Sequence, residues 1–476
     1  MDPAPAPPLG PGPLRRKAGL VLVPLTFVGL HLAPLDLEPE AQAMAALFVA
    51  VVIAWVTEVV PIAVTALMVG PGLVASGICD AKTAFKSYAD PLLFLFVGGF
   101  FIARAMMRHG LDRRLALRFA GAGWVRGRPR RVRLAFLSAG VVLSMWVSNT
   151  ATTAILAPIL LGTFDDESTE GERQGSLLTL AYGCSVGGLG TLVGSPPNLI
   201  TARFLGEAKG TGFGFVDWMM VGLPMALLGA LMIYLVSLRL LPTGVGERDV
   251  TRETRPWSRG EKVTALAFVI AVVGWMTPGV LKSAGFEVGR QLAAALPGGA
   301  VALLASLPLF LFRDDDERMV LPWEDAARID WGIIMLFGGG IALGTQMFAT
   351  GLAEVLAQGF VEATGVRDVW TLTVLVTVFT IFFTEVCSNT ASANMLVPLV
   401  LAICLELGVD PTAPALGVGL AASCAFMLPI ATGPNAIVFG TGLIPLPTMM
   451  RKGAALNVLG ALLIVAVLRV LVPWMG

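Results

Sequence analysis

Two copies of the tripeptide Ser-Asn-Thr, Ser148–Thr150 and Ser388–Thr390, supply the side chains of this sequence best suited to hold a small ligand. In each copy Ala follows the threonine, and Pro158 or Pro398 stands eight residues after it. Both copies lie in apolar sequence, where Ser, Thr and Asn also serve simply as hydrogen-bonding groups between membrane helices. That role would explain one copy, but two copies half a chain apart in matching surroundings indicate a site.

A second pair of segments repeats at nearly the same spacing. Gly194–Asn198 (Gly-Ser-Pro-Pro-Asn) corresponds to Ala431–Asn435 (Ala-Thr-Gly-Pro-Asn), and the weaker pair Phe96–Gly99 corresponds to Phe337–Gly340. The near-constant offset indicates an internal duplication, with one polar tripeptide and one Pro-Asn segment in each half.

The chemistry available at these segments suits an anion and a cation together. Proline removes a backbone donor and frees the carbonyl one turn before it, so we expect the Pro-Asn segments to be unwound and not simply kinked. Helix starts at such breaks carry free N–H groups and partial positive charge, which attract an anion. The freed carbonyls and the Ser, Thr and Asn oxygens suit a hard monovalent cation such as sodium. Since no Arg or Lys stands within these segments, bound cations would supply the positive charge that an anion needs, which is a physical reason for coupling.

The elements that position these segments must be membrane helices. The 476 residues are 56% hydrophobic and 14% charged, with a mean hydropathy of +0.79, against about 25% charged residues in soluble proteins. Long apolar runs recur along the chain, so we predict an all-α polytopic protein embedded in the lipid bilayer. The segment 108–133 holds nine arginines. Between membrane spans such a segment indicates a cytoplasmic amphipathic helix and not a nucleic-acid site.

Length identifies two segments that enter the membrane without crossing it. About 31 residues lie between Arg133 and Asp165, with the first tripeptide in the middle, whereas two crossings need roughly 40 residues. A second segment of this kind occupies about 369–406. Both fit re-entrant hairpins that turn at the tripeptide, a geometry tolerated only inside protein or beside a watery cavity.

The remaining apolar runs predict about eleven transmembrane helices, two of them broken at the Pro-Asn segments. We predict a disordered tail over 1–17 that lies in the cytoplasm. Counting the spans from there also puts in the cytoplasm the basic loops 108–133 and 242–262 and the pair Arg451–Lys452. The two hairpins then open to opposite sides, and the two halves form an inverted repeat. Inverted repeats with broken helices are the architecture of secondary transporters and favour alternating access over a channel. The predicted spans are 18–35, 41–56, 59–78, 91–107, 176–205, 217–241, 263–281, 289–312, 332–350, 413–442 and 448–474.

Together with Trp55–Pro61 near the start, these motifs resemble the divalent anion/sodium symporter family, the dicarboxylate and citrate transporters, over nearly the whole chain. The resemblance implies a multi-pass protein of the cell (inner) membrane that forms homodimers. It also implies an elevator mechanism, in which a transport domain moves against a scaffold domain. The scaffold would comprise 18–131, which includes the cytoplasmic amphipathic segment, and 217–368; the transport domain would comprise 132–216 and 369–476.

The resemblance further implies a site, residue by residue. One sodium ion would bind Ser144, Ser148, Asn149 and the carbonyl of Gly194. A second would bind Thr384, the carbonyl of Cys387, Asn389 and the carbonyl of Ala431. The substrate-binding residues would be Asn149, Thr150, Ser195, Pro196, Ser388, Asn389, Thr390, Thr432 and Gly433. The family often has Pro where Gly433 stands, so the backbone beside Thr432 has more freedom here.

The expected function is symport of a small dianionic substrate, a C4-type dicarboxylate such as succinate, malate or fumarate, with sodium ions as coupling ions and no organic cofactor. Two alternatives stay open within the transporter class. One is a sodium-independent dicarboxylate exchanger, and the other is a sodium-coupled sulfate transporter.

Three further features suggest other chemistry. Gly183–Gly187 matches the G-x-S-x-G nucleophile pattern around Ser185, yet neither His31 nor His109 has an evident route to that serine, so we do not expect an enzyme. Glu58 and Glu385 stand at apolar depth, where an acid carries protons or holds structure; we favour a structural role for both. The five cysteines lack CxxC spacing and predict neither disulfides nor a metal cluster.

Overall fold

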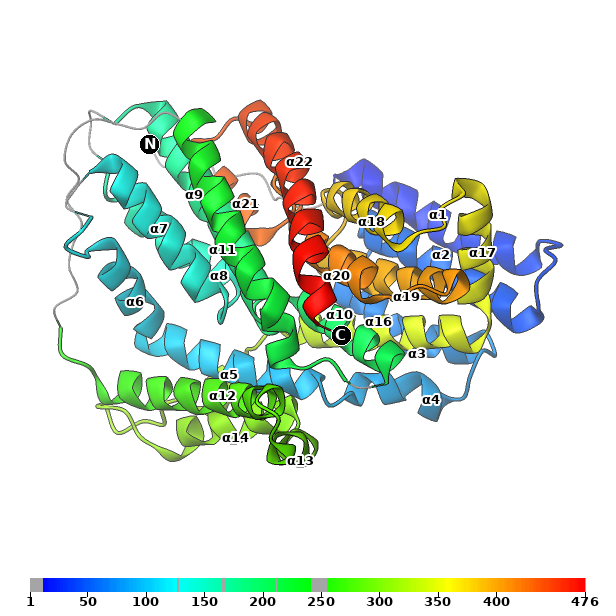
Figure 1. The fold of residues 1–476 in the computed structure, drawn as a ribbon, viewed down its shortest axis with the longest axis horizontal. Coiled ribbons are helices and arrows are strands. Elements are labelled where there is room, and N and C mark those ends of the chain that lie inside the picture. The colour runs from blue at the N-terminus through cyan, green and yellow to red at the C-terminus, as the bar shows by residue number, and fades with distance from the viewer. Residues whose placement is uncertain (1–11, 126–127, 165–167, 211, 241–254, 476) are drawn as a thin grey trace.

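The structure, a computed structural model, describes residues 12–125, 128–164, 168–210, 212–240 and 255–475. Over these residues the regular elements are all helices, as predicted, apart from one isolated bridge between Arg313 and Met319. Figure 1 shows the helices from blue at the start to red at the end. Their bounds are α1 (Pro13–Leu32), α2 (Pro39–Thr57), α3 (Ile62–Ala75), α4 (Ala81–Lys86), α5 (Leu93–His109), α6 (Leu111–Ala120), α7 (Pro129–Ser144), α8 (Asn149–Leu161), α9 (Glu170–Gly187), α10 (Pro196–Lys209), α11 (Phe215–Leu240), α12 (Arg259–Ser283), α13 (Glu287–Ala295), α14 (Gly298–Leu311), α15 (Trp323–Ala326), α16 (Trp331–Ala349), α17 (Leu352–Thr364), α18 (Val369–Thr384), α19 (Asn389–Leu407), α20 (Thr412–Ala421), α21 (Gly433–Gly440) and α22 (Leu446–Leu471), with 3-10 turns at η1 (Ser87–Ala89), η2 (Gly188–Gly190) and η3 (Val472–Trp474).

Among the described residues, seven helices are long and apolar enough to cross a membrane, or up to nine if each of two bent helix pairs counts as one span. The bent pairs are α13 with α14, at 70°, and α17 with α18, at 100°. The polytopic helical class is confirmed. Of the predicted spans, α1, the 14-residue α3 and the two spans that divide at a Pro-Asn segment are not among these seven. One of the seven, α19, is instead an arm of the second predicted hairpin.

Both tripeptides lie at the turn of a helical hairpin. α7 and α8 form the first hairpin, and α18 and α19 form the second. Asn149 and Asn389 begin the second helix of each hairpin, directly after a serine in extended conformation. Three of the four arms have 13 or 16 residues, whereas α19 has 19 and is one of the seven helices long enough to cross a membrane.

The Pro-Asn segments unwind the two predicted broken spans at equivalent places. α9 ends at Gly187, and after η2 and a turn over 191–194 α10 begins at Pro196. α20 ends at Ala421, and α21 begins only at Gly433, directly before Pro434. Proline suits the first turn of a helix, where its missing N–H has no partner to lose. The prolines therefore begin new helices here and do not kink continuous ones.

Glycines explain the third, weaker repeat. A Cβ on Gly98 in α5 would overlap the backbone of Ala302 in α14, and a Cβ on Gly339 in α16 would overlap the backbone of Ala66 in α3. Both crossings join helices from opposite halves of the chain. The two Gly-Gly motifs thus make equivalent close crossings, and the repeat extends to the helices that surround the hairpins.

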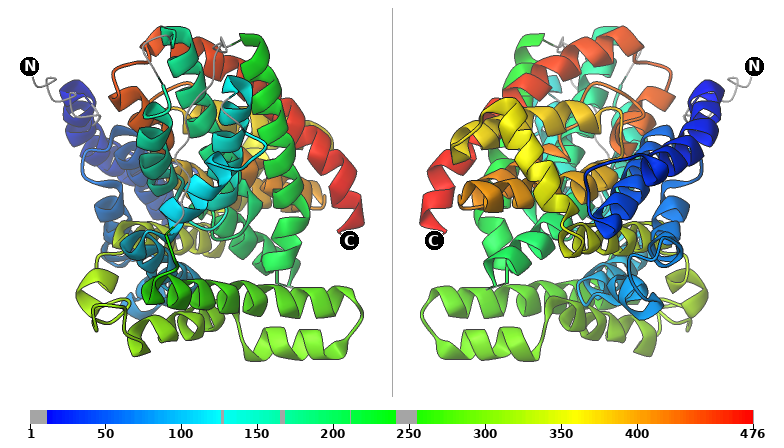
Figure 2. Two further views of the ribbon diagram at one scale, coloured as in Figure 1. Left: turned by 90° about the vertical axis from the view of Figure 1, so that its left-hand side faces the viewer. Right: turned by 90° about the vertical axis from the view of Figure 1, so that its right-hand side faces the viewer.

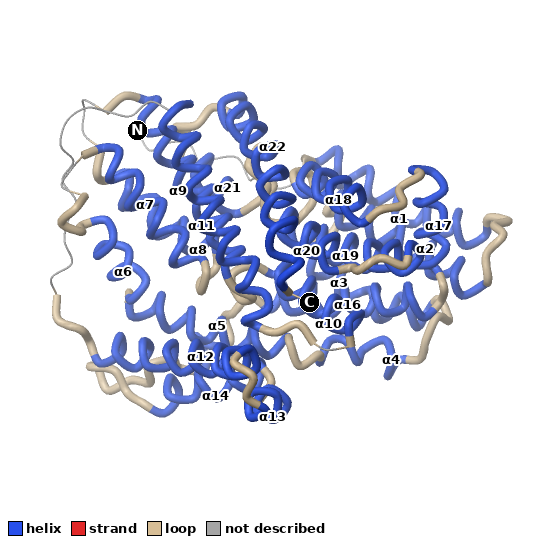
Figure 3. The backbone as a smooth tube through the Cα atoms, in the orientation of Figure 1, coloured by secondary structure: helices blue, strands red, loops and turns tan. Residues whose placement is uncertain are grey.

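The hairpins and broken helices form one packed unit in which the halves interlock. α7 packs on α9, and α18 packs on α20 in the same way; α8 contacts α21, and α10 contacts α19. α11 packs along both α9 and α22 (Figure 1). In Figure 1, α12 and α14 lie along the lower edge, and α1, α2 and α17 lie at the right. Figure 2 shows α12 and α13 side by side at one end of the molecule, and Figure 3 shows that short loops join most of the helices.

The N-terminal helix starts earlier than expected. α1 begins at Pro13, so Arg15, Arg16 and Lys17 belong to its first turns and not to the tail predicted over 1–17. Residues 1–11 of that tail, residues 165–167 after the first hairpin, and residues 242–254 of the predicted loop 242–262 lie outside the described residues. Arg15 donates to the carbonyls of Val56 and Val386, which ties α1 to the turn of the second hairpin.

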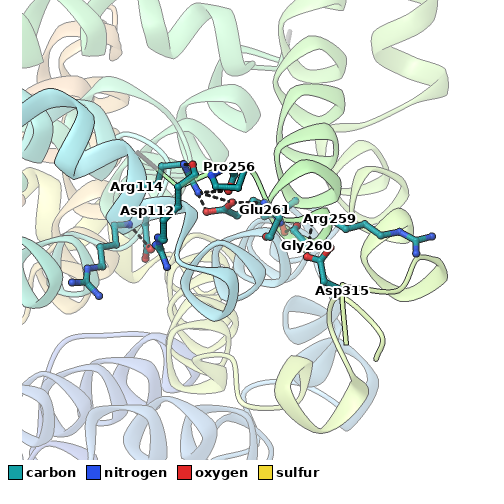
Figure 4. A network of polar contacts seen from close by, with 11 residues as sticks. Asp112, Arg114, Pro256, Arg259, Gly260, Glu261 and Asp315 are labelled. Carbon is teal, nitrogen blue, oxygen red and sulfur yellow. Dashed lines mark hydrogen bonds and ion pairs between the residues drawn. The ribbon is translucent and has the colours of Figure 1, made fainter. Parts of the chain in front are cut away.

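A buried ion pair fixes the helix that precedes the first hairpin. Arg114 of α6 donates to both carboxylate oxygens of Glu261 at the start of α12, at 2.7 and 3.0 Å, and both side chains are at most 3% exposed (Figure 4). Arg114 also donates to the carbonyls of Arg255 and Pro256 and lies over the ring of Trp257. The arginine-rich segment 108–133 therefore contains a helix, α6, which is anchored to α12 by Arg114, its one buried arginine.

Candidate functional site

A cavity of about 450 Å³ lies where the two hairpins meet the two unwound segments. Residues of α3, α5 and α16 close its other side. Every residue predicted to bind substrate lines it, although these residues come from four separate stretches, two in each half of the chain. They are Asn149, Thr150, Ser195, Pro196, Ser388, Asn389, Thr390, Thr432 and Gly433. Among the predicted sodium ligands, Ser148, Gly194 and Ala431 also reach the wall, while Ser144, Thr384 and Cys387 are buried behind it.

Four helix N-termini meet at this cavity. α8, α10, α19 and α21 begin after Ser148, Ser195, Ser388 and Thr432, all of which line the wall. Ser and Thr are preferred N-caps because their hydroxyl accepts a bond from the first turn. In the described structure none of these four hydroxyls caps its own helix. The start of each helix therefore lies at the cavity wall, where its partial positive charge suits an anion. α8 and α19 also offer N–H groups in their first turns, whereas α10 begins with two prolines that carry none.

The first predicted cation site has unused oxygens. Ser144 is fully buried, and its hydroxyl and the Asn149 side-chain oxygen have no hydrogen-bond partner among the described residues. A buried polar atom without a partner costs roughly 1–3 kcal/mol. Asn149 packs against Gly188, where a Cβ would lie 2.6 Å from its Oδ1. Oxygens alone are the ligands that a hard cation prefers, so these residues fit a sodium ion between the first hairpin and the first unwound segment.

The second predicted cation site is organised differently. The Thr384 hydroxyl lies 2.9 Å from both Asn389 Oδ1 and the carbonyl of Ala422. Thr384 is fully buried, and Cys387 is 3% exposed. The residues again present oxygens, but two of them are already hydrogen-bonded to each other. The two halves thus hold chemically similar sites in different states of hydrogen bonding.

Two asparagines, which the sequence showed only as motif members, hold the unwound segments in place. Asn198 Nδ2 donates to the carbonyls of Gly188 and Thr191, both at 2.7 Å. Asn435 Nδ2 donates to the carbonyls of Ala425 and Leu428, both at 3.1 Å, at the same sequence offsets. Both asparagines are fully buried. We call these contacts the asparagine clips; they orient the backbone that carries Gly194, Ser195, Ala431 and Thr432.

Glu385 stabilises the second unwound segment and has no acidic counterpart at the first one. Its carboxylate accepts bonds from the backbone N–H groups of Phe426, Met427 and Leu428 at 2.8–2.9 Å, and from Asn457 Nδ2 at 2.8 Å. The side chain is 4% exposed. The equivalent position in the first half is Met145, whose carbonyl accepts from the hydroxyl of Thr191. The structural role expected for Glu385 therefore agrees with its contacts. Glu58 ends α2 in the left-handed conformation (φ 47°).

Two contacts beside the cavity join the halves. The hydroxyls of Ser195 and Ser423 lie 2.9 Å apart, and both residues are at most 2% exposed. A Cβ on Gly433 would overlap the side chain of Thr150. The tip of the first hairpin therefore lies directly against the start of α21, in the place that a larger residue at 433 would occupy. Sequence reasoning missed Ser423 because it stands outside the repeated motifs.

The structure does not assemble hydrolase chemistry around Ser185. This serine is 1% exposed, and its hydroxyl donates to the carbonyl of Ala181 within the helix. His109 Nε2 contacts the carbonyl of Val320, and His31 stacks on Phe27. The described residues contain no group of three His, Cys, Asp or Glu side chains that could hold a metal ion, and all five cysteines are free.

Comparison with known proteins gives matches over nearly the full length. A family model described as the sodium:sulfate symporter transmembrane region matches residues 16–476. The sodium-dependent dicarboxylate transporter SdcS of Staphylococcus saprophyticus is 34% identical, over 96% of this chain and 91% of that protein. An uncharacterized transporter of Haemophilus influenzae is 35% identical, over 93% of this chain and 94% of that protein.

Two solved structures have a similar fold. The YdaH transporter of Alcanivorax borkumensis matches with a TM-score of 0.55 at 14% identity, over 96% of this chain and 97% of that one. MtrF of Neisseria gonorrhoeae matches with a TM-score of 0.56 at 12% identity, over 93% of this chain and 96% of that one. At such low identity the likeness concerns the fold alone.

Proposed function

Since the chain belongs to the sodium:sulfate symporter family, whose members are membrane transporters and not enzymes, we propose that it carries a C4-type dicarboxylate such as succinate, malate or fumarate together with sodium ions. The observation that carries the proposal is the convergence of four uncapped helix N-termini on one cavity. Two of them come from each half, and a dianion with a carboxylate at each end has matching symmetry. The relatives named as sodium-dependent dicarboxylate transporters support this choice.

Sodium is the proposed coupling ion because the cavity wall offers an anion no side chain of positive charge among the described residues. We place one ion at Ser144, Ser148, Asn149 and the Gly194 carbonyl, and a second at Thr384, Asn389 and the carbonyls of Cys387 and Ala431. The unpartnered oxygens of Ser144 and Asn149 support the first site. Asn149 and Asn389 stand between cation and substrate, so each ion would orient an amide that binds the anion.

We further propose an elevator movement of the packed unit of hairpins and broken helices against the helices around it. α11 packs along α9 and α22, so we assign it to the moving unit, although the resemblance placed 217–368 in the scaffold. The cavity wall includes the N-terminal ends of α3 and α16. With the N-terminus in the cytoplasm, as proposed, both of these ends are cytoplasmic, which favours a state open to the inside.

The resemblance to homodimeric transporters leads us to propose a homodimer in the cell membrane. The scaffold would form the dimer contact, so that each transport unit moves independently within its own protomer. Cross-linking in native membranes, with the fraction of dimer as the readout, tests this assembly.

The deciding experiment for the function is uptake of labelled succinate into proteoliposomes, with and without an inward sodium gradient. Uptake should fall sharply when choline replaces external sodium. Equal uptake in choline that depends on dicarboxylate loaded inside would establish a sodium-independent exchanger. Sodium-driven uptake of sulfate that succinate does not inhibit would establish a sulfate transporter.

A further inference from the structure

Asp330 brings a negative charge to the wall of a cavity that otherwise suits an anion. It is the one acidic or basic residue among the described residues that line the cavity. Asp330 caps α16, where its Oδ1 accepts a bond from the N–H of Ile333 at 3.3 Å. The side chain is exposed, and no basic group pairs with it in the described part of the chain. Its charge therefore acts on whatever occupies the cavity.

The repeat supplies a natural comparison. Asp90 stands near the corresponding position, three residues before α5, where its Oδ1 accepts from the N–H of Leu92 at 2.9 Å. Unlike Asp330, Asp90 is paired: its Oδ2 lies 2.7 Å from Nε of Arg203 in α10. Asp90 is also absent from the cavity wall as described. Of these two acids near corresponding helix starts, one is neutralised by the packed unit and the other lines the cavity.

Helix capping alone does not require this charge. Asn, Ser and Thr cap a helix about as well as Asp does, so a neutral side chain at 330 would serve α16 equally. The charge has a cost for the proposed reaction, because like charges repel. In surroundings close to water, a unit charge about 8 Å away changes affinity roughly twofold. The effect multiplies with each further charge on the ligand.

We propose that Asp330 is a specificity-determining residue that selects substrates by their total charge, admitting dianions and disfavouring trianions. This inference rests on the proposed function. The attraction to the four helix N-termini and the repulsion from Asp330 both grow with the charge of the ligand, so Asp330 lowers the gain in binding that each further carboxylate would bring. The balance favours a C4 dicarboxylate over a tricarboxylate of similar width, such as citrate.

The test compares Asp330→Asn with the unaltered protein in equilibrium binding of succinate and citrate, purified in detergent, at fixed sodium and about pH 8, where all the carboxyl groups are ionised. Asn keeps the cap and the shape but removes the charge. Affinity should rise about fourfold for the dianion and about eightfold for the trianion. The selectivity for succinate should thus fall about twofold, and added choline chloride should shrink the difference by screening.

Two matched variants separate charge from structure. Asp330→Glu keeps the charge and should keep the selectivity. Asp368→Asn removes an equivalent cap charge, at the start of α18 and outside the cavity wall, and should leave both affinities unchanged. An unchanged succinate-to-citrate ratio in Asp330→Asn, with normal sodium-dependent succinate binding, would overturn the selector role alone. Absence of sodium-dependent binding in the unaltered protein would instead overturn the proposed function.

Discussion

At the scale of single residues, Asn149 and Asn389 each offer an amide oxygen to a cation and an amide N–H₂ to a carboxylate. Asn→Ala at either position should weaken both substrate and sodium binding, since one side chain serves both. Thr150→Val and Thr390→Val keep the shape and remove one hydroxyl, so they should mainly weaken substrate binding, by about tenfold to a hundredfold for a bond worth roughly 1.5–3 kcal/mol. Substrate affinity measured at several sodium concentrations distinguishes the two patterns. If the Asn→Ala variants behave like the wild type, the tripeptides pack helices together and do not form the binding site.

Gly433 is needed because Thr150 occupies the space of its missing side chain. Gly433→Ala should displace Thr150 and weaken substrate binding by about as much as loss of the threonine hydroxyl. Combined with Thr150→Ala, which removes Oγ1 and Cγ2 and leaves only the Cβ at 2.9 Å, it should cause little further loss. A double-mutant cycle on substrate affinity measures this coupling. Additive losses would contradict it.

Ser144 and Thr384 hold equivalent positions with different partners. The Ser144 hydroxyl has no partner in the described structure, so Ser144→Ala should not lower the melting temperature without sodium but should reduce its rise on sodium addition. The Thr384 hydroxyl donates to Ala422 or Asn389, so Thr384→Val should lower the melting temperature even without sodium. Thermal unfolding of both variants across a sodium series is the measurement. Equal behaviour of the two would exclude a ligand role for Ser144.

At the scale of elements, the sequence predicted the parts that depend on backbone chemistry. Proline fixes where helices break, and the length of an apolar run fixes whether it crosses, so both hairpins and both unwound segments were predicted. The partners of the breaks were not predictable. The asparagine clips, the bonds from Phe426, Met427 and Leu428 to Glu385, and the pair Ser195–Ser423 join positions whose proximity arises only from tertiary packing.

The anchor of α6 gives a prediction on stability. Arg114→Met leaves Glu261 buried without its ion partner, a loss of about 3–5 kcal/mol, and should lower the melting temperature strongly. Adding Glu261→Gln removes the stranded charge, keeps the capping bond from Ser258, and should recover much of the loss. Arg118→Met, which removes only a contact over Trp257, is the control. A similar change in melting temperature for Arg114→Met and Arg118→Met would contradict the anchor.

At the scale of the whole molecule, the interlocked halves require opposite orientations in the membrane. Glu170, at the start of α9, and Glu406, at the end of α19, are exposed and occupy opposite sides of the proposed topology. In a background without native cysteines, Glu170→Cys should react with an impermeant thiol reagent only from the cytoplasm, and Glu406→Cys only from outside. Reaction of both from one face would exclude the inverted topology.

The asparagine clips have a thermodynamic consequence. Asn198 and Asn435 hydrogen-bond to the backbone at both unwound segments without a ligand. The backbone around the cavity is therefore ordered before an ion binds. Ordering a flexible segment would bury new apolar surface and appear as a large negative heat-capacity change. Calorimetry of sodium binding should therefore show a small heat-capacity change. Asn198→Ala and Asn435→Ala should make it more negative, as ion binding then has to order the backbone that the amides now hold.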